Sequence, residues 1–182
     1  VALYRKQQLP NYDVFDEQRY FTAGSDDCIV DFKGHRLGLL VCEDLWTNEL
    51  VDRLKQKGAE IIITINASPY DTEKTAHREE LVRAHCLRTE LPIIYVNQIG
   101  GQDELVFDGQ SFVTNKQGLV THQLAAFKEH IQEVVFSEQI ESIGKIVKSE
   151  TNTLAQVYDA LVLATRDYVT KNGFQGIVLG LS

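Results

Sequence analysis

The sequence predicts a mixed α/β fold, and three observations support this expectation. Two largely apolar segments, 59–66 and 91–98, are typical of strands buried within a sheet. An amphipathic stretch at 72–90 lies between them and predicts a long helix. Several short strand-like segments separated by turns follow. Buried strands that alternate with a helix before an antiparallel region indicate a mixed α/β architecture.

The elements of the first half follow from local patterns. The predicted series is a turn-rich loop at 1–27, strands at 28–32 and 36–42, a helix at 48–57 and a strand at 59–66. The first two strands flank Lys33-Gly34-His35 and predict a β-hairpin. Gly58 is expected to end the short helix. The β-branched run from Ile61 to Ile65 suits a sheet covered on both faces.

The second half predicts further strands and then one more helix. After the strand at 91–98, the expected elements are a turn at 100–104, strands at 105–107, 111–115, 119–124 and 130–136, a helix at 153–172 and a strand at 176–182. The late helix has apolar residues on one predicted face, namely Leu154, Val157, Leu161, Ala164 and Tyr168. Gly173 is expected to cap it.

The pattern divides the chain into two unequal parts. Residues 1–136 form a first domain, and the polar, poorly periodic segment 137–151 predicts a linker. Residues 152–182 then read as the beginning of a second domain. The chain has no Met, and its last predicted strand has no following partner. We therefore expect a segment of a longer protein, with the first domain incomplete at its start and the second truncated.

Composition excludes several classes of protein. The net charge of −8 argues against nucleic acid as a partner, because phosphate binding needs a basic surface. No apolar run reaches the about 20 residues that span a bilayer. Three widely spaced cysteines predict neither a disulfide framework nor a zinc site and favour a reducing cytoplasm. The five histidines lack metal-binding spacing, so no metal is expected.

Cys42 is the first candidate for chemistry. It ends the run LGLLV and precedes Glu43-Asp44, and α/β folds place reactive groups where a buried strand ends. Taken alone, it is more readily explained as an inert buried cysteine. Nucleophilic use requires a cation or base from elsewhere. Lys6 is a candidate cation, although most lysines are simply solvated.

Polar residues follow the next strand too. Asn66, Ser68 and Tyr70 offer donors and acceptors for an amide or a carboxylate, but Ser68 is equally plausible as a helix cap. Lys74 and Arg78 are one turn apart, so they either bind an anion or are solvated together. Asn97, within an apolar strand, must have its amide hydrogen-bonded if it is buried.

These stretches together resemble the glutamine-dependent NAD synthetase family of the nitrilase superfamily. The resemblance implies a nitrilase-like α-β-β-α sandwich, followed by the first helix and strand of an ATP-pyrophosphatase-type α/β domain. It extends over essentially the whole chain. The stretches that carry it are YRKQQLPNYDVFDEQRYF (4–21), LGLLVCEDLW (37–46), NASPYDTEK (66–74), YVNQIGGQDELVFDGQSFV (95–113) and YDALVLATRDYVTKNGFQGIVLGLS (158–182).

The resemblance also assigns roles to residues. The family uses a Glu-Lys-Cys triad, in which Lys6 and Cys42 match the lysine and the nucleophile. Its general-base glutamate has no counterpart here, so residues 1–182 alone are expected to hydrolyse glutamine poorly. Glu17 resembles a second, positioning glutamate. The backbone N–H of Glu43 is expected to stabilise the oxyanion. The residues that match the glutamine contacts of the family are Tyr12, Ser68 and Lys74.

The implied activity is glutamine-dependent NAD synthesis. Cys42 would form a thioester with glutamine and release ammonia, and no cofactor is expected for that step. ATP and magnesium would serve the synthetase domain, which amidates nicotinic acid adenine dinucleotide. The resemblance further implies a cytoplasmic homo-oligomer, with no nucleic-acid or membrane partner. Two alternatives stay open from the residues: a stand-alone nitrilase-type amidase and an inactive scaffold fragment.

Overall fold

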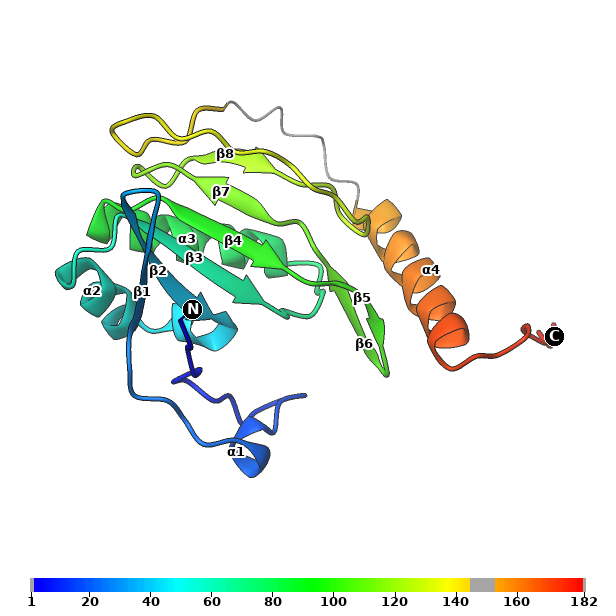
Figure 1. Cartoon of the computed structure of the whole chain (residues 1–182). Helices are drawn as coiled ribbons and strands as arrows, with labels where there is room; N and C mark the ends of the chain where they lie inside the picture. Colours follow the sequence, from blue (N-terminus) through cyan, green and yellow to red (C-terminus); the bar gives the residue numbers. More distant parts are fainter. Residues whose placement is uncertain (1, 145–152, 182) are drawn as a thin grey trace.

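The computed structural model describes residues 2–144 and 153–181. Figure 1 shows a central sheet with helices against it, an N-terminal arm below it, and a last helix beside a two-stranded extension. In chain order the elements are α1 (Glu17–Tyr20), β1 (Cys28–Phe32), β2 (His35–Val41), the 3-10 helix η1 (Cys42–Trp46), α2 (Asn48–Gln56), β3 (Ile61–Asn66), α3 (Lys74–Thr89), β4 (Ile93–Asn97), β5 (Ile99–Gln102), β6 (Leu105–Asp108), β7 (Phe112–Thr114), β8 (Val120–Gln123) and α4 (Thr153–Lys171).

The main sheet has the strand order β1-β2-β3-β4-β7-β8. The predicted hairpin is present, since β1 and β2 pair antiparallel. Strands β2, β3 and β4 are parallel, with Val41 opposite Ile65 and Asn66 opposite Asn97. The carboxyl ends of these three strands therefore meet at one edge of the sheet, which brings the segments after Val41, Asn66 and Asn97 together.

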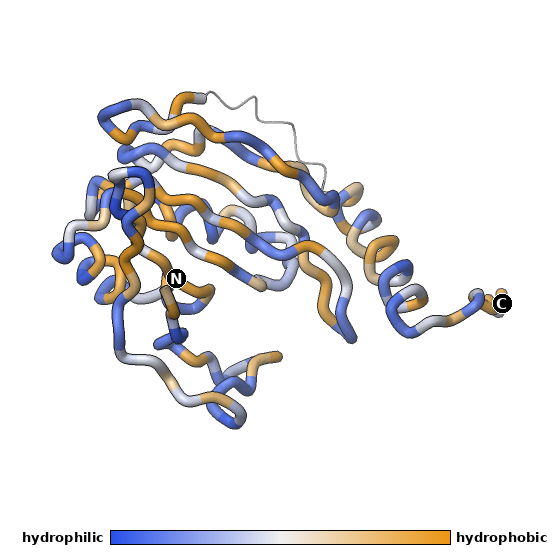
Figure 2. The backbone as a smooth tube through the Cα atoms, in the orientation of Figure 1, coloured by the Kyte–Doolittle hydropathy of each residue, from blue (hydrophilic) through white to orange (hydrophobic). Residues whose placement is uncertain are grey.

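One face of this sheet carries the hydrophobic core. Side chains of α2, α3 and the central strands belong to one buried cluster, which includes Leu54, Ile62, Val82 and Ile93. The central strands are largely hydrophobic along their length (Figure 2). Burial of each large apolar side chain in this cluster contributes about 1.5–3 kcal/mol. The helices predicted at 48–57 and 72–90 are confirmed to within two residues at each end.

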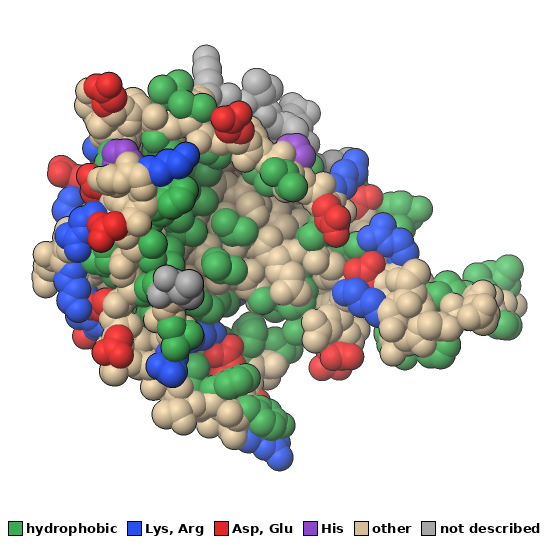
Figure 3. Space-filling view, in the orientation of Figure 1, with side chains coloured by type: hydrophobic (Ala, Val, Ile, Leu, Met, Phe, Trp, Pro, Cys, Tyr) green, Lys and Arg blue, Asp and Glu red, His purple; other side chains and the backbone are tan. Residues whose placement is uncertain are grey.

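The expectation of a sheet covered on both faces is wrong for the described residues. Ile65 is 61% exposed and Val96 40% exposed, whereas Ile62 and Thr64 are fully buried. Because α2 and α3 pack into the same cluster, they leave the other face open. Figure 3 shows hydrophobic side chains gathered over that open face.

The turn predicted at 100–104 is shorter than expected. Gly100 and Gly101 belong to β5, and only Asp103 and Glu104 form the turn to β6. The glycines permit close packing of a helix rather than a bend. A Cβ built on Gly101 would lie 3.0 Å from Cα of Ala164 in α4. Asp167 of α4 also accepts a hydrogen bond from the Gly101 N–H at 2.8 Å.

Helix α4 forms where it was predicted, but it buries the predicted face only in part. Ala160 and Leu163 are the buried residues, and they pack with Phe127 and the side chain of Tyr70. Leu154, Leu161 and Tyr168 of the predicted apolar face are 81%, 63% and 54% exposed. Of the predicted face only Val157 and Ala164 are partly buried, because contact with the glycines of β5 selects the side of the helix that carries Ala164 and Asp167. Gly173 follows the helix with φ +71°, as expected of a cap.

Two predicted strands are absent among the described residues. Residues 130–136 form only an isolated bridge between Phe136 and Ser142, and Ile131 is 97% exposed. Residues 176–181 belong to no strand, and Val178 is fully exposed. Apolar sequence alone does not make a strand, because a strand also needs a neighbour for its backbone hydrogen bonds. Residues 145–152 of the predicted linker lie outside the described residues.

A membrane span is not found among the described helices. None of them combines the length and the apolar character that crossing a bilayer requires.

Candidate active site

Cys42 lies at the junction between β2 and η1, at the carboxyl edge of the parallel strands. Its φ is +50°, in the left-handed region that a non-glycine residue adopts at a cost of about 1–3 kcal/mol. Cys42 lines two cavities. The larger has a volume of about 630 Å³ and the smaller of about 190 Å³. A thiol at this turn is therefore accessible from two sides although its backbone is fixed by the sheet.

Lys6 and Glu17 form an ion pair on the wall of the larger cavity. The Nζ atom of Lys6 lies 2.7 Å from both carboxylate oxygens of Glu17. Their side chains are 14% and 25% exposed, so solvent screens the pair only in part. Both residues come from the N-terminal arm, which we define as residues 2–27. The structure thus brings Lys6, Glu17 and Cys42 to one cavity, although sequence spacing gave no sign of their proximity.

The electrostatic surroundings of Cys42 favour the neutral thiol. Burial is the largest influence and raises the pKa of Cys42. The nearby carboxylates of Glu43 and Glu17 raise it further. A hydrogen bond with the backbone of Ala67 and the positive charge of Lys6 act in the opposite direction. The resting group is a thiol that needs proton removal to act as a nucleophile.

The three residues predicted to contact substrate all line the smaller cavity. The hydroxyl of Tyr12 donates to Oε1 of Glu43 at 2.8 Å. Burial and this hydrogen bond raise the pKa of Tyr12 to about 12. Lys74 Nζ lies 5.3 Å from the ring centroid of Trp46, a residue that the sequence analysis did not single out. The cavity therefore offers both a cation and a carboxylate.

Ser68 is held by a buried network rather than exposed as a free hydroxyl. Its Oγ accepts from Nε of Arg78 at 3.1 Å, and its N–H donates to Oδ1 of Asn97 at 3.0 Å. Nη1 of Arg78 contacts both carboxylate oxygens of Asp108 at 2.9 Å, and Nη2 donates to the carbonyls of Ser68 and Pro69. This network fixes the loop after β3.

The polar side chains of Asn97, Arg78 and Asn66 are all held by hydrogen bonds within the protein. The prediction that Asn97 must satisfy its amide is confirmed, because Ser68 supplies both a donor and an acceptor. Arg78 is neither solvated nor a ligand-binding cation, since its side chain is 2% exposed and its anion is Asp108. The amide of Asn66 donates to the carbonyls of Thr64 and Val96, which leaves its role structural.

Asp44 is a further buried group that sequence reasoning missed. Its carboxylate has no exposed area and accepts hydrogen bonds from four donors, on Tyr4, Gln7, Gln8 and Val41. The available signal was its position two residues after a predicted strand end, since an acid there must be either solvated or fully hydrogen-bonded.

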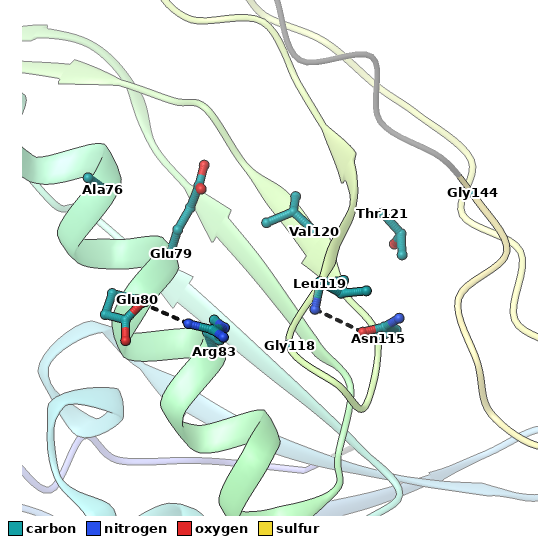
Figure 4. Close-up of a pocket in the computed structure, with 10 residues that line it drawn as sticks. All are labelled: Ala76, Glu79, Glu80, Arg83, Asn115, Gly118, Leu119, Val120, Thr121 and Gly144. Atoms are coloured by element: carbon teal, nitrogen blue, oxygen red, sulfur yellow. Dashed lines mark hydrogen bonds and ion pairs between the residues drawn. The ribbon is translucent and has the colours of Figure 1, made fainter.

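Another cavity, of about 560 Å³, lies between α3 and the turn from β7 to β8. Figure 4 shows Glu80 and Arg83 of α3 on one side, with an ion pair of 3.6 Å between them, and Asn115 on the other. Asn115 accepts from the Leu119 N–H within its own turn. This cavity has no nucleophile, and none of its lining residues was predicted as a site residue.

Metal-binding groups do not gather anywhere in residues 2–144 and 153–181, where no three His, Cys, Asp or Glu side chains are placed to share an ion. His85 is buried beside the Leu45 carbonyl, with Nε2 at 2.6 Å, and burial lowers its pKa.

The chain is similar in sequence to a known hydrolase family and to several named enzymes. Residues 1–144 match the family model described as carbon-nitrogen hydrolase. The glutamine-dependent NAD(+) synthetase of Acinetobacter baylyi is 40% identical over 183 residues, which covers 100% of this chain and 34% of the relative. That of Aquifex aeolicus is 34% identical over 215 residues, covering 100% and 38%. The chain thus spans about a third of the length of these relatives.

Solved structures give the same result. The glutamine-dependent NAD+ synthetase from Acinetobacter baumannii, determined in complex with ADP, is 42% identical and superposes with a TM-score of 0.90 over 98% of this chain and 34% of that one. An amidase of the nitrilase superfamily from Nesterenkonia is 28% identical, with a TM-score of 0.62 over 69% of this chain and 46% of the amidase. The predicted nitrilase-superfamily fold is confirmed by these similarities.

Proposed function

The chain belongs to the carbon-nitrogen hydrolase family, and from that premise we propose that Cys42 is the nucleophile of a glutamine-hydrolysing site. The observation that carries the proposal is the placement of Cys42 and the Lys6–Glu17 pair on the wall of one cavity. Relatives similar to this chain along its whole length bear the name glutamine-dependent NAD(+) synthetase, which supports glutamine as the substrate.

The chemistry follows from the groups present. The sulfur of Cys42 attacks the carbon of the glutamine carboxamide, and the thiol proton is transferred away. The oxyanion that forms is stabilised by Lys6 and by the backbone N–H of Glu43. An ammonium group has three donors, and Lys6 directs two at Glu17, so a third can face the oxyanion. Ammonia then leaves with that proton, and water hydrolyses the thioester to glutamate.

Glu17 acts in this scheme by orienting Lys6. Both of its oxygens face the Lys6 ammonium, and it is the only carboxylate among the described residues that line the larger cavity. The resemblance to the glutaminase family implies a separate glutamate as the general acid and base. No step of that proton transfer is assigned to a residue of this chain.

The smaller cavity suits the amino-acid end of glutamine. A zwitterion needs a cation for its carboxylate and an anion for its ammonium group, and Lys74 and Glu43 supply these charges. Tyr12 fixes the Glu43 carboxylate through its hydroxyl. Ser68 contributes by fixing the loop that borders this cavity, because its N–H donates to Asn97 and both its carbonyl and its hydroxyl oxygen accept from Arg78.

The released ammonia is proposed to serve NAD synthesis elsewhere in the natural-length protein. There, nicotinic acid adenine dinucleotide would be adenylated with ATP and magnesium, and ammonia would displace AMP. The described residues 174–181 are exposed and belong to no helix or strand. The start of a synthetase domain at 152–182, the homo-oligomer and the cytoplasmic location are likewise proposals.

The decisive test is Cys42→Ala in the natural-length protein that contains this chain. We expect it to abolish NAD synthesis from glutamine and to leave synthesis from free ammonia intact. Cys86→Ala is the control for loss of a thiol, because Cys86 is buried in the core and lies outside both cavities. Normal use of glutamine by the Cys42→Ala protein would refute the nucleophile assignment.

A stand-alone amidase is the second candidate, and the similarity to the Nesterenkonia amidase favours it. That similarity covers 69% of this chain, whereas the similarity to NAD synthetases extends through α4. Comparing kcat/KM for glutamine and for butyramide separates the two. A preference for butyramide would favour the amidase, because a simple amide has no charges for Lys74 and Glu43.

A further inference from the structure

Asp44 connects the two halves of the candidate site. Its Oδ1 accepts from the backbone N–H groups of Gln7 and Gln8, at 3.0 and 2.7 Å. Its Oδ2 accepts from the hydroxyl of Tyr4 at 2.8 Å and from the N–H of Val41 at 3.2 Å. Three of these donors lie in the arm on both sides of Lys6, and the fourth directly precedes Cys42.

The arm has few other means of being positioned. Among the described residues, the backbone hydrogen bonds of residues 2–24 stay within that segment, for example from the Gly24 N–H to the Lys6 carbonyl. Residues 2–24 pair with no strand of the sheet. The sheet, by contrast, fixes Cys42 through the ladder between β2 and β3. Side chains must therefore set the distance between Lys6 and Cys42.

The four donors saturate the Asp44 carboxylate. An ionised carboxylate has about four lone-pair sites, and here each oxygen receives two hydrogen bonds. Complete satisfaction compensates for the burial of the charge, since an unpaired buried carboxylate would be strongly unfavourable. The bonds are directional, so they fix the backbone on both sides rather than merely attracting it.

We propose that Asp44 is a positioning residue that holds Lys6 at the distance from Cys42 that catalysis requires. The inference rests on the proposed glutaminase function, because Lys6 matters only if it acts on Cys42 or on the oxyanion. Asp44 itself touches no substrate in this scheme. It acts through the backbone of Gln7 and Gln8, next to Lys6, and through Val41, next to Cys42.

Asp44→Asn in the natural-length protein tests the proposal. Asparagine keeps one oxygen for Gln7 and Gln8 but places an NH₂ group against the Val41 N–H, so it breaks the connection to the strand. We expect kcat for glutamine to fall about 100-fold while KM stays within about threefold, because a misplacement near 1 Å is that costly to the chemical step.

Asp27→Asn is the matched control. Asp27 is also a nearly buried carboxylate of the arm, with a side chain 4% exposed. It binds Arg53, Lys57 and, at 3.4 Å, the side-chain amide of Gln7, and within the described part of the arm it makes no hydrogen bond with the backbone beside Lys6. If Asp44 contributed only to stability, the two variants would change kcat in proportion to their losses of stability. We expect Asp27→Asn to keep kcat within about threefold.

Cys42 alkylation by iodoacetamide supplies a readout that does not depend on glutamine. We expect its pH midpoint to rise in Asp44→Asn, because Lys6 lowers the pKa of Cys42. In a Lys6→Met background, Asp44→Asn should cause no further shift, since the two changes remove the same interaction. Cys28 and Cys86 are buried and serve as slowly reacting references.

The outcomes separate the two proposals. Additive effects of Asp44→Asn and Lys6→Met, or equal behaviour of Asp44→Asn and Asp27→Asn, would overturn the role of Asp44. One outcome is that the wild-type protein does not hydrolyse glutamine while Asp44→Asn still shifts the Cys42 alkylation midpoint only when Lys6 is present. In that case only the glutaminase proposal would fail. If Asp44→Asn does not fold, Tyr4→Phe is the replacement variant, because it removes one of the four donors to Asp44. A smaller rise in the pH midpoint of Cys42 alkylation, absent when Lys6→Met is also present, would support the role of Asp44.

Discussion

The arm and the edge of the sheet each carry part of the site, and they are held in different ways. Cys42 follows a strand that pairs with β3 from Leu37 to Val41. Lys6 and Glu17 lie in a segment whose only regular element is the four-residue α1. The sheet edge is stabilised by backbone ladders over a hydrophobic core, whereas the arm around Lys6 depends on side-chain contacts such as those of Asp44.

This difference separates stability from catalysis. Changes near the sheet edge should act on the unfolding free energy of the whole domain, because that edge is continuous with the core cluster. Changes at Lys6 and its immediate neighbours in the arm should act on the rate of the reaction and leave global stability almost unaltered. Variants on the two sides can test whether this separation holds.

The largest expected effect on stability is that of Arg78→Leu on the sheet side. The variant leaves the fully buried Asp108 carboxylate without its cation and frees the loop at Ser68. We expect the free energy of unfolding to fall by about 3–5 kcal/mol, as for other broken buried ion pairs. Urea denaturation would measure this loss.

Arg83→Leu is the control for that variant, because Arg83 lies on the same helix with a side chain 53% exposed. We expect its unfolding free energy to stay within about 0.5 kcal/mol of wild type. If Arg78→Leu were equally mild, the buried network would not be what fixes the loop after β3.

Lys6→Met on the arm side should lower the reaction rate strongly and the unfolding free energy only slightly. Loss of an oxyanion-stabilising donor lowers kcat by about 100- to 1000-fold. The unfolding free energy should change by less than about 1 kcal/mol, because a partly exposed ion pair contributes little. Steady-state kinetics with glutamine and a urea titration of the same preparation provide the two numbers.

Lys55→Met is the matched control for this change, since Lys55 is an exposed lysine on α2 and lines neither Cys42 cavity. Its kcat should equal that of the wild type. A Lys6→Met protein that lost stability as Arg78→Leu does would show that the arm is part of the folding unit after all.

The difference between the sheet with its core and the arm also explains which elements could be predicted from the sequence. Apolar periodicity indicated β2, β3, β4, α2 and α3, because their burial imposes a pattern on the residues themselves. It failed at 130–136 and 176–181, where pairing partners decide the outcome. It gave the buried side of α4 only in part, because contact between Gly101 and Ala164, and not average hydrophobicity, decides which side is buried.

The residues of the proposed site could be named from the sequence, but their geometry could not. Cys42 was recognisable at a strand end, and Lys6 and Glu17 only through family resemblance, since no spacing rule links an irregular arm to a sheet. Asp44 was missed, and the buried ion pair of Arg78 was not foreseen, because each has a partner at least 30 residues away. Long-range polar contacts leave no periodic signal in a sequence.

The smallest expected effect is a pH dependence of the unfolding free energy that arises from Cys86 on the sheet side. Burial raises the pKa of this core thiol to about 11, from an ordinary value of 9.0. Because the folded state keeps the proton more tightly, the associated stability is present below pH 9 and is lost as the pH rises from 9 towards 11. The loss due to Cys86 should amount to about 2 kcal/mol.

Urea titrations at pH 8 and pH 11 would measure the slope with which the unfolding free energy falls as the pH rises, in the wild type and in Cys86→Ala. Other buried groups, among them Tyr95, also titrate at high pH, so the prediction concerns the difference between the two slopes. The Cys86→Ala slope should be shallower, whereas the pH midpoint for Cys42 alkylation should not move, because that midpoint reports the arm through Lys6. Equal slopes in both proteins would contradict the assignment of this loss to Cys86, and a shifted Cys42 midpoint would show that the core and the arm are coupled.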